Sequence, residues 1–515
     1  MDNRTFLIGI DVSTTACKVV VWDQAGGVAN TARAPLLVEM AKSGWHEQPA
    51  ESWWRALCQA LRKALRGIDP GRLAGLAIAH QRETFVPVDE QGRPLRNGIL
   101  WMDERAGSLL PELAETLRLT AFHRITGKPL SGNLTLAKIA WLRRYEPEIF
   151  QHTRYYLEVH AYLVYCLTGK FATGWGCADP TGLFDIVKNC WAEEILQKMG
   201  LRPDQFPPAF PAGTHLGELS RGAARATGLP EGMPVFAGLG DGQAGGLGAN
   251  ICQNGTAYLT LGTSVVSGTF SNRYLVDPAF RTMVGGIPNT YLLETVLLGG
   301  TYTIDWLMHT ILGKKGASLT RQRQVFEAEL DRVPPGSAGL LLVPYWNSAM
   351  NPYWDASASG VILGLRGSHT PIQLYRAILE GIGFELRLEI EGVETALRHP
   401  IESLVVMGGG ARSAGWCQII ADITGKPAVR LATEEAAALG AGILVAAGSG
   451  LYTDIAQAAQ AMSRRSPEGF LPNPERCQYY QQVYTDVYRS IYPALRQPMA
   501  RLAELIQGKF LSTPS

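Results

Sequence analysis

The sequence lacks several signals that would assign a chain of 515 residues to a functional class. Its eight cysteines form no CxxC pair, which argues against a zinc site or a disulfide framework. It contains no GxxxxGK[ST] motif, which excludes a P-loop nucleotide site. With 47 Lys and Arg against 46 Asp and Glu, the net charge of +1 is too small to draw the whole protein to nucleic acid or an anionic membrane.

Long apolar runs are also missing. The N-terminal residues contain no basic segment followed by a long apolar one, and the most apolar later run, residues 436–447, is interrupted by glycine and too short to span a membrane. The hydrophobic content of 46% still provides for a large buried core. We therefore expect a soluble cytoplasmic protein of two to four domains, with no nucleic-acid or membrane partner.

The order of apolar and polar segments is similar in the two halves of the chain. Residues 5–10 and 17–22 read as strands joined by the polar turn 11–15, and residues 257–261 and 265–270 repeat this pattern around the turn 262–264. Helical spacing and further short strands follow each hairpin. The sequence thus predicts a duplicated α/β fold, with a cleft at the glycine-rich segment 240–246 between the halves.

The two predicted hairpin tips carry groups suited to phosphate. The first tip offers a carboxylate, hydroxyls and a cation, from Asp11, Ser13, Thr14, Thr15 and Lys18. The second consists of Gly262, Thr263 and Ser264. Such residues also fill tight turns for conformational reasons, so either tip alone is weak evidence. Facing each other across a hinge, the two tips would form a clamp for the phosphates of a nucleotide.

A third feature is the glycine run after the apolar strand that ends at Met407. Gly408, Gly409, Gly410 and Ala411 would let the backbone approach a flat ring or a phosphate, although helix capping explains the same residues.

Asp241 is the acidic candidate at the predicted hinge. It follows a buried strand and has glycine on both sides, so its carboxylate could take a proton from a hydroxyl during phosphoryl transfer. A helix N-cap is the alternative. The segment also matches GxGxxG, but a nicotinamide or flavin enzyme needs an acidic residue about 20 positions later, and none occurs between residues 243 and 270.

Arg82 and Glu83 form a candidate pair for vicinal hydroxyls, and Trp101 could cover the apolar face of a sugar. An ion pair beside a core tryptophan is the simpler interpretation of these residues from their spacing alone.

Two signatures carry a resemblance to a known family. Residues 360–365 and 373–380 fit one signature throughout, and residues 133–145 fit an earlier one with departures at Asn133 and Tyr145. From residue 8 to about 490, the sequence resembles the FGGY family of carbohydrate kinases.

The resemblance implies two actin-like (ribonuclease H-like) α/β domains that close on ATP, Mg²⁺ and a small sugar or polyol. The implied boundaries are an N-terminal domain at 1–248, a C-terminal domain at 249–490, and a C-terminal helix and tail at 491–515; a possible homodimer is also implied. Asp241 would be the catalytic base and Asp11 the Mg²⁺ ligand. The implied nucleotide-binding residues are Thr14, Thr15, Lys18, Gly262, Thr263, Gly409, Gly410 and Ala411. The expected substrate-binding residues are Arg82, Glu83, Trp101, Asp241 and Gln243.

The substrate remains open between two members of the family. The string Gln81-Arg82-Glu83-Thr84 is similar to glycerol kinases, whereas segments 126–129, 138–142 and 178–185 resemble xylulokinases. We expect phosphorylation of D-xylulose or a related ketopentose or polyol. The alternatives are a glycerol or other short-polyol kinase and, in a different class, an actin-like nucleotide switch without a small substrate.

Overall fold

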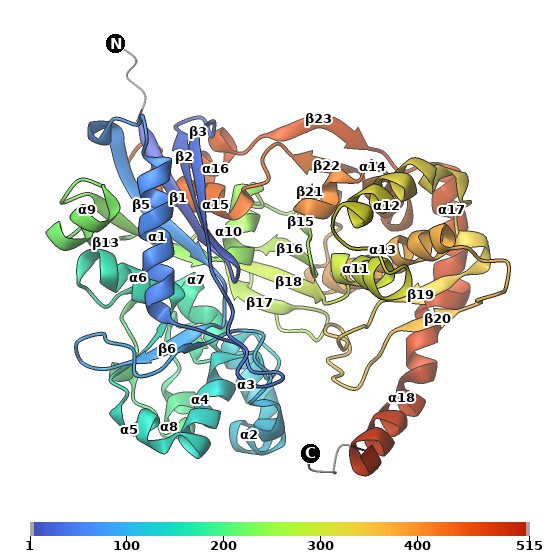
Figure 1. Cartoon of the computed structure of the whole chain (residues 1–515), viewed down its shortest axis with the longest axis horizontal. Helices are drawn as coiled ribbons and strands as arrows, with labels where there is room; N and C mark the ends of the chain where they lie inside the picture. The colour runs from blue at the N-terminus through green and yellow to red at the C-terminus, as the bar shows by residue number, and fades with distance from the viewer. Residues whose placement is uncertain (1–4, 511–515) are drawn as a thin grey trace.

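The computed structural model describes residues 5–510 and is built around two large β-sheets with helices on both sides of each (Figure 1). The N-terminal sheet has the strand order β13-β14-β5-β1-β2-β3. Its strands are β1 (Phe6–Val12), β2 (Ala16–Asp23), β3 (Val28–Pro35), β5 (Leu73–His80), β13 (His215–Glu218) and β14 (Pro234–Gly240).

The C-terminal sheet has the order β17-β18-β16-β15-β21-β22-β23. Its strands are β15 (Thr256–Leu261), β16 (Val265–Ser271), β17 (Arg281–Val284), β18 (Tyr291–Leu297), β21 (Ser403–Met407), β22 (Ala428–Leu431) and β23 (Arg465–Phe470). Both sheets contain three antiparallel strands followed by two parallel ones, β3-β2-β1-β5-β14 and β18-β16-β15-β21-β22. The predicted α/β architecture with two similar hairpins is therefore confirmed.

One boundary differs from the sequence prediction. Residue 11 was expected in the first turn, but β1 continues to Val12, and Asp11 pairs with Lys18 of β2 and with Ala79 of β5. Because the neighbouring strand β5 pairs with β1 as far as residue 12, the ladder extends beyond the apolar run. Asp11 and Lys18 consequently lie opposite each other at the edge of the cleft.

Smaller elements complete each half. Beside the N-terminal sheet lie the four-stranded sheet β4 (Glu47–Gln48), β7 (Gly98–Ile99), β6 (Phe85–Val88) and β8 (Tyr155–Glu158), and the two-stranded sheets β9 (Thr173–Gly174) with β12 (Ala209–Phe210) and β10 (Phe184–Asp185) with β11 (Cys190–Trp191). The helices of this half are α1 (Ala50–Ala64), α2 (Leu110–Leu117), α3 (Leu119–Thr126), α4 (Thr135–Tyr145), α5 (Pro147–His152), α6 (Val159–Thr168), α7 (Trp175–Ala178), α8 (Glu193–Met199) and α9 (Arg221–Thr227).

The C-terminal half adds the strand pair β19 (Leu341–Val343) and β20 (Val361–Leu363) and the helices α11 (Thr301–Trp306), α12 (Gly316–Glu329), α13 (Pro371–Leu397), α14 (Ala414–Thr424), α17 (Pro474–Val483) and α18 (Arg489–Phe510). The C-terminal helix expected from the sequence corresponds to α18, and the last five residues of the expected tail lie outside the described residues. Within residues 5–510, no helix combines the length and apolar composition that crossing a bilayer requires.

A layer of helices separates the two sheets (Figure 1). It contains α10 (Asp241–Gly248), α15 (Ala436–Gly448) and α16 (Ile455–Met462). Along β1 the side chains alternate, so that Ile8 and Ile10 face the core with α1 and α6, whereas Leu7 faces α15. Although α15 comes late in the sequence, it thus packs on the N-terminal sheet.

Glycines allow this central layer to pack closely. A Cβ on Gly440 of α15 would lie 2.0 Å from the carbonyl oxygen of Ala244 in α10, and one on Gly248 of α10 would lie 2.1 Å from that of Ala436. On the other side of α15, a Cβ on Gly9 of β1 would lie 1.9 Å from the carbonyl oxygen of Ala438. The N-terminus of α10 is thereby fixed between the sheets.

We expect Gly440→Ala to destabilise the protein. Alanine is favoured over glycine in a helix by about 1 kcal/mol, but its methyl group would press on the backbone of α10, and overpacking of this kind costs about 1–3 kcal/mol or more. Urea unfolding measures the difference. The control is Gly107→Ala, where the added Cβ meets no atom within 4 Å; equal midpoints for the two variants would contradict the role of close packing.

Candidate active site

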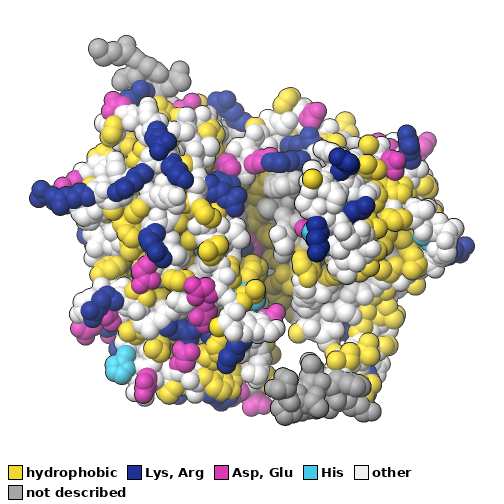
Figure 2. All heavy atoms as spheres, viewed as in Figure 1, with side chains coloured by type: hydrophobic (Ala, Val, Ile, Leu, Met, Phe, Trp, Pro, Cys, Tyr) yellow, Lys and Arg dark blue, Asp and Glu magenta, His cyan; other side chains and the backbone are white. Residues whose placement is uncertain are grey.

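Two adjoining cavities occupy the cleft between the halves, which Figure 2 shows as a groove between the two lobes. The Glu435 cavity, of about 220 Å³, is lined by residues including Asp11, Lys18, Gly408 and Glu435. The Trp101 cavity, of about 480 Å³, is lined by Trp101 and both hairpin tips. Three residues line both cavities: Arg82, Asp241 and Val266.

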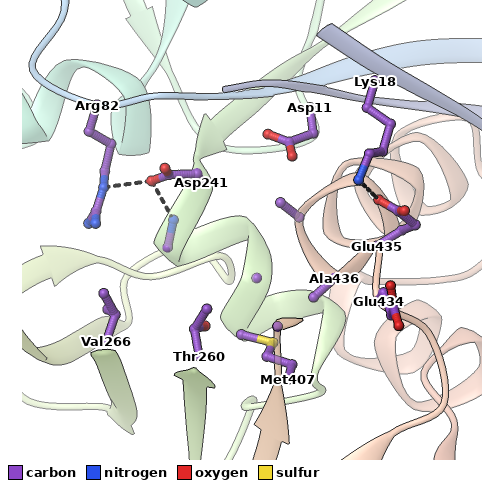
Figure 3. Close-up of a pocket in the computed structure, with 14 residues that line it drawn as sticks. Asp11, Lys18, Arg82, Asp241, Thr260, Val266, Met407, Glu434, Glu435 and Ala436 are labelled. Atoms are coloured by element: carbon purple, nitrogen blue, oxygen red, sulfur yellow. Dashed lines mark hydrogen bonds and ion pairs between the residues drawn. The ribbon is translucent and has the colours of Figure 1, made fainter. Parts of the chain in front are cut away.

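Asp241 lies where the two cavities meet, at the first residue of α10 (Figure 3). Arg82 Nε lies 2.9 Å from its Oδ1 atom, and the backbone N–H of Gly242 donates to the same oxygen at 2.7 Å. The side chain is 43% exposed. Because both contacts reach Oδ1, the second oxygen, Oδ2, retains its lone pairs for a ligand in the cleft.

Asp241 is one end of a chain of alternating charges that crosses the cleft. Arg82 also donates from Nη1 to Glu294 of β18, at 2.8 Å to Oε2. Arg281 of β17 lies 2.6 Å from Oε1 of Glu294 and 3.0 Å from Oε1 of Glu83. We call these five residues, Asp241, Arg82, Glu294, Arg281 and Glu83, the charge chain.

Glu294 is the centre of the charge chain and is completely buried. Burial alone would raise the pKa of this carboxyl, but the positive charges of Arg281 and Arg82 outweigh it and lower the pKa to about 2. The residue therefore remains ionised and holds one arginine from each half of the chain.

The Glu435 cavity contains a second group of charges (Figure 3). Lys18 Nζ lies 2.6 Å from Oε2 of Glu435, which precedes α15. The pKa of Asp11 is raised to about 7, first by burial and then by the negative charges of Asp241 and Glu435, with Lys18 opposing. Oδ1 of Asp11 is buried and has no hydrogen-bond partner among the described residues.

The structure brings the two hairpin tips to the same cavity. Thr14, Thr15 and Thr263 all line the Trp101 cavity. The indole N–H of Trp101 donates to Thr14 Oγ1 at 2.9 Å, which ties the first tip to the cavity wall. Gly262 lies behind Thr263, and its carbonyl oxygen accepts from the N–H of Thr301 at 2.8 Å.

Five predicted residues lie outside the walls of both cavities: Gly262, Gly409, Gly410, Ala411 and Gln243. Gly408 lines the Glu435 cavity, whereas Gly409, Gly410 and Ala411 belong to the following 3₁₀ turn. Gly409 faces open space, since a Cβ there would meet no atom within 4 Å. Gln243 is buried, and its Nε2 donates to the carbonyl oxygen of Gly176 at 3.0 Å, so it packs behind the site.

Sequence reasoning missed Arg281 and Glu294, and also Lys128, whose buried ammonium group pairs with Asp179 beside the Trp101 cavity. No motif marks Arg281 and Glu294, because each lies in an ordinary strand and its partners are distant in sequence, whereas Lys128 lies in the family-like segment 126–129. The separation of Arg82 and Glu294, for example, is 212 positions.

Comparison with known proteins assigns the family. The sequence model of the N-terminal domain of FGGY carbohydrate kinases matches residues 6–248, and that of the C-terminal domain matches residues 257–449. The chain belongs to the FGGY family of carbohydrate kinases. It is therefore a phosphotransferase that uses ATP and accepts a small sugar, and the two-domain fold expected from the resemblance is confirmed.

Relatives cover almost the whole chain. A xylulose kinase of Bacillus subtilis (strain 168) is 30% identical, covering 95% of this chain and 96% of its own, and one of Escherichia coli (strain K12) is 30% identical, covering 96% and 100%. A xylulose kinase structure from Rhodospirillum rubrum is 26% identical with a TM-score of 0.88, covering 96% of this chain and all of its own. A gluconate kinase structure from Lactobacillus acidophilus, 23% identical with a TM-score of 0.89 and covering 97% and 100%, shares the fold.

We expect Glu294→Gln to lower the free energy of unfolding by about 3–5 kcal/mol at pH 7, because it leaves the buried Arg82 and the mostly buried Arg281 without their shared carboxylate. The contribution is present above the ordinary pKa of 4.5 and is lost as the pH falls toward 2. The difference between wild type and variant in denaturant unfolding should therefore shrink below pH 4.5. A difference that stays constant down to pH 3 would contradict this origin.

Proposed function

We propose that this kinase transfers the γ-phosphate of ATP to a hydroxyl group of a ketopentose, with D-xylulose as the first candidate and Asp241 as the general base. The observation that carries the proposal is the position of Asp241, whose carboxylate lies at the junction of the two cavities. The names of the B. subtilis and E. coli relatives support the choice of sugar.

The residues of the cleft fit a bound nucleotide. Hydroxyl donors for phosphate groups are available from the exposed Thr263 and from the first hairpin tip at Thr14 and Thr15. The open space beside Gly409 leaves room for the nucleotide. Lys18 adds a positive charge at the adjoining cavity. ATP supplies the phosphoryl group when bound, and the protein contributes position and charge.

Asp11 fits a role as Mg²⁺ ligand. Mg²⁺ prefers carboxylate and phosphate oxygens, and Oδ1 of Asp11 is a buried acceptor without a partner among the described residues. Its surplus of negative neighbours, Asp241 and Glu435, favours a divalent cation at this position.

The contacts of Asp241 define how it would act. Arg82 and the N–H of Gly242 hold Oδ1, so the orientation of the carboxylate is fixed before the sugar binds. Oδ2 then accepts the proton of the attacking hydroxyl, while the hairpin tips hold the reacting groups in line. Closure of the halves would exclude the water that otherwise competes for the phosphate.

The substrate test is coupled ADP release with Mg-ATP over D-xylulose, L-xylulose, D-ribulose, L-ribulose, glycerol, erythritol and ribitol. We expect the highest kcat/KM with a ketopentose. A glycerol kinase is the second candidate, because Arg82 and Glu83 line the sugar-sized cavity, and preferential turnover of glycerol would replace the ketopentose.

Asp241→Asn should bind ATP normally and lose about 10²- to 10⁴-fold in kcat, the usual effect of removing a general base. Calorimetry of nucleotide binding provides the control for folding. Turnover close to that of the wild type would remove Asp241 from the role of base.

Asp11→Asn should weaken the Mg²⁺ dependence of nucleotide binding, because a neutral amide is a poorer ligand for a hard cation. Titration of ATP with and without Mg²⁺ measures this without turnover. Identical Mg²⁺ dependence in wild type and variant would exclude Asp11 as a ligand.

A further inference from the structure

Both arginines of the charge chain are shared between two carboxylates. Arg82 lies between Asp241 and Glu294, and Arg281 lies between Glu294 and Glu83. The chain therefore begins and ends on a carboxylate, and these two ends, Asp241 and Glu83, line the Trp101 cavity. Glu294 lies behind them and is completely buried.

The remaining cation of this cavity is also compensated. Lys128 pairs with Asp179 and donates to the carbonyl oxygens of Thr126 at 2.7 Å and Thr282 at 3.1 Å. Within residues 5–510, each cation that lines the Trp101 cavity thus has a carboxylate partner. Three cations and four carboxylates give the group a net negative charge.

We propose that Arg281 and Glu294, both from the C-terminal half, are specificity-determining residues that restrict the Trp101 cavity to uncharged sugars and exclude sugar acids. The inference deepens the proposed function and rests on it. Glu294 neutralises the arginine that would otherwise attract an anion, and Arg281 orients Glu83 toward the cavity.

The physical reason is the cost of separating a buried ion pair. A sugar hydroxyl can donate to Glu83 or Asp241 and accept from an arginine while the charge chain stays intact. A sugar carboxylate would need an arginine that is already paired, and it would approach two carboxylates of its own sign. The fold itself does not impose this choice, since a gluconate kinase shares it.

The first experiment compares wild-type kcat/KM for D-xylulose and D-ribulose with that for D-xylonate and D-gluconate. We expect turnover of a neutral sugar and at least about 100-fold lower kcat/KM for both acids. An acid that equals or exceeds the neutral sugars would overturn the inference while leaving the kinase assignment intact. ADP release with none of these sugars or the polyols would instead remove the proposed function, and the inference with it.

The second experiment changes the charges one at a time. Glu83→Gln should raise the ratio of acid to neutral kcat/KM by at least about tenfold, because Arg281 loses one of its two carboxylates. Arg281→Gln removes a positive charge from the same cavity. It should lower kcat/KM for neutral sugars without raising the ratio of acid to neutral kcat/KM. The control Glu90→Gln removes an exposed carboxylate from the turn that follows β6, outside the cavity lining, and should leave both values unchanged.

The ratio separates specificity from damage to the fold. If the substitutions only loosened the cavity, kcat/KM for acidic and for neutral sugars would change by the same factor in both variants. That result would overturn the role of the charge chain in specificity. A rise in the ratio for Arg281→Gln equal to that for Glu83→Gln would do the same.

Discussion

The close packing of α10 against α15 is the constraint on which the rest of the site depends. Gly440 and Gly248 have no side chains at the points where the helices touch, so the two backbones approach within distances that a Cβ would prevent. This contact joins a helix of the first half to a helix from the end of the second half. It places Asp241, at the start of α10, in the same cavity as Glu435, which precedes α15.

Charge is distributed along the cleft in two connected groups. Near α15, Asp11, Asp241 and Glu435 outnumber Lys18, which suits a divalent cation and phosphates. In the Trp101 cavity, the charge chain balances its arginines with carboxylates, which suits hydroxyl groups. Asp241 belongs to both groups, so the residue expected to take the proton lies where the two cavities meet.

Much of the candidate site could be predicted because its residues belong to local patterns. The hairpin tips are marked by short polar residues between apolar runs, and Asp241 by a buried strand followed by glycines. The end of the first strand was harder to predict. The sequence pattern puts residues 11 and 12 in the turn, whereas pairing of β1 with β5 continues the strand to Val12. Gln243 is a predicted substrate contact that lines neither cavity, and its Nε2 donates to the carbonyl oxygen of Gly176.

By itself, the sequence determined the family, the duplicated α/β order and the base candidate, because strand, turn and helix signals act over a few residues. Only the tertiary structure decided which charges meet. Arg82 and Glu294 are 212 positions apart, and Lys18 reaches Glu435 from the opposite end of the chain. Such contacts depend on how the two halves are placed against each other, and that placement is set by the packing of α10 and α15 rather than by any local pattern.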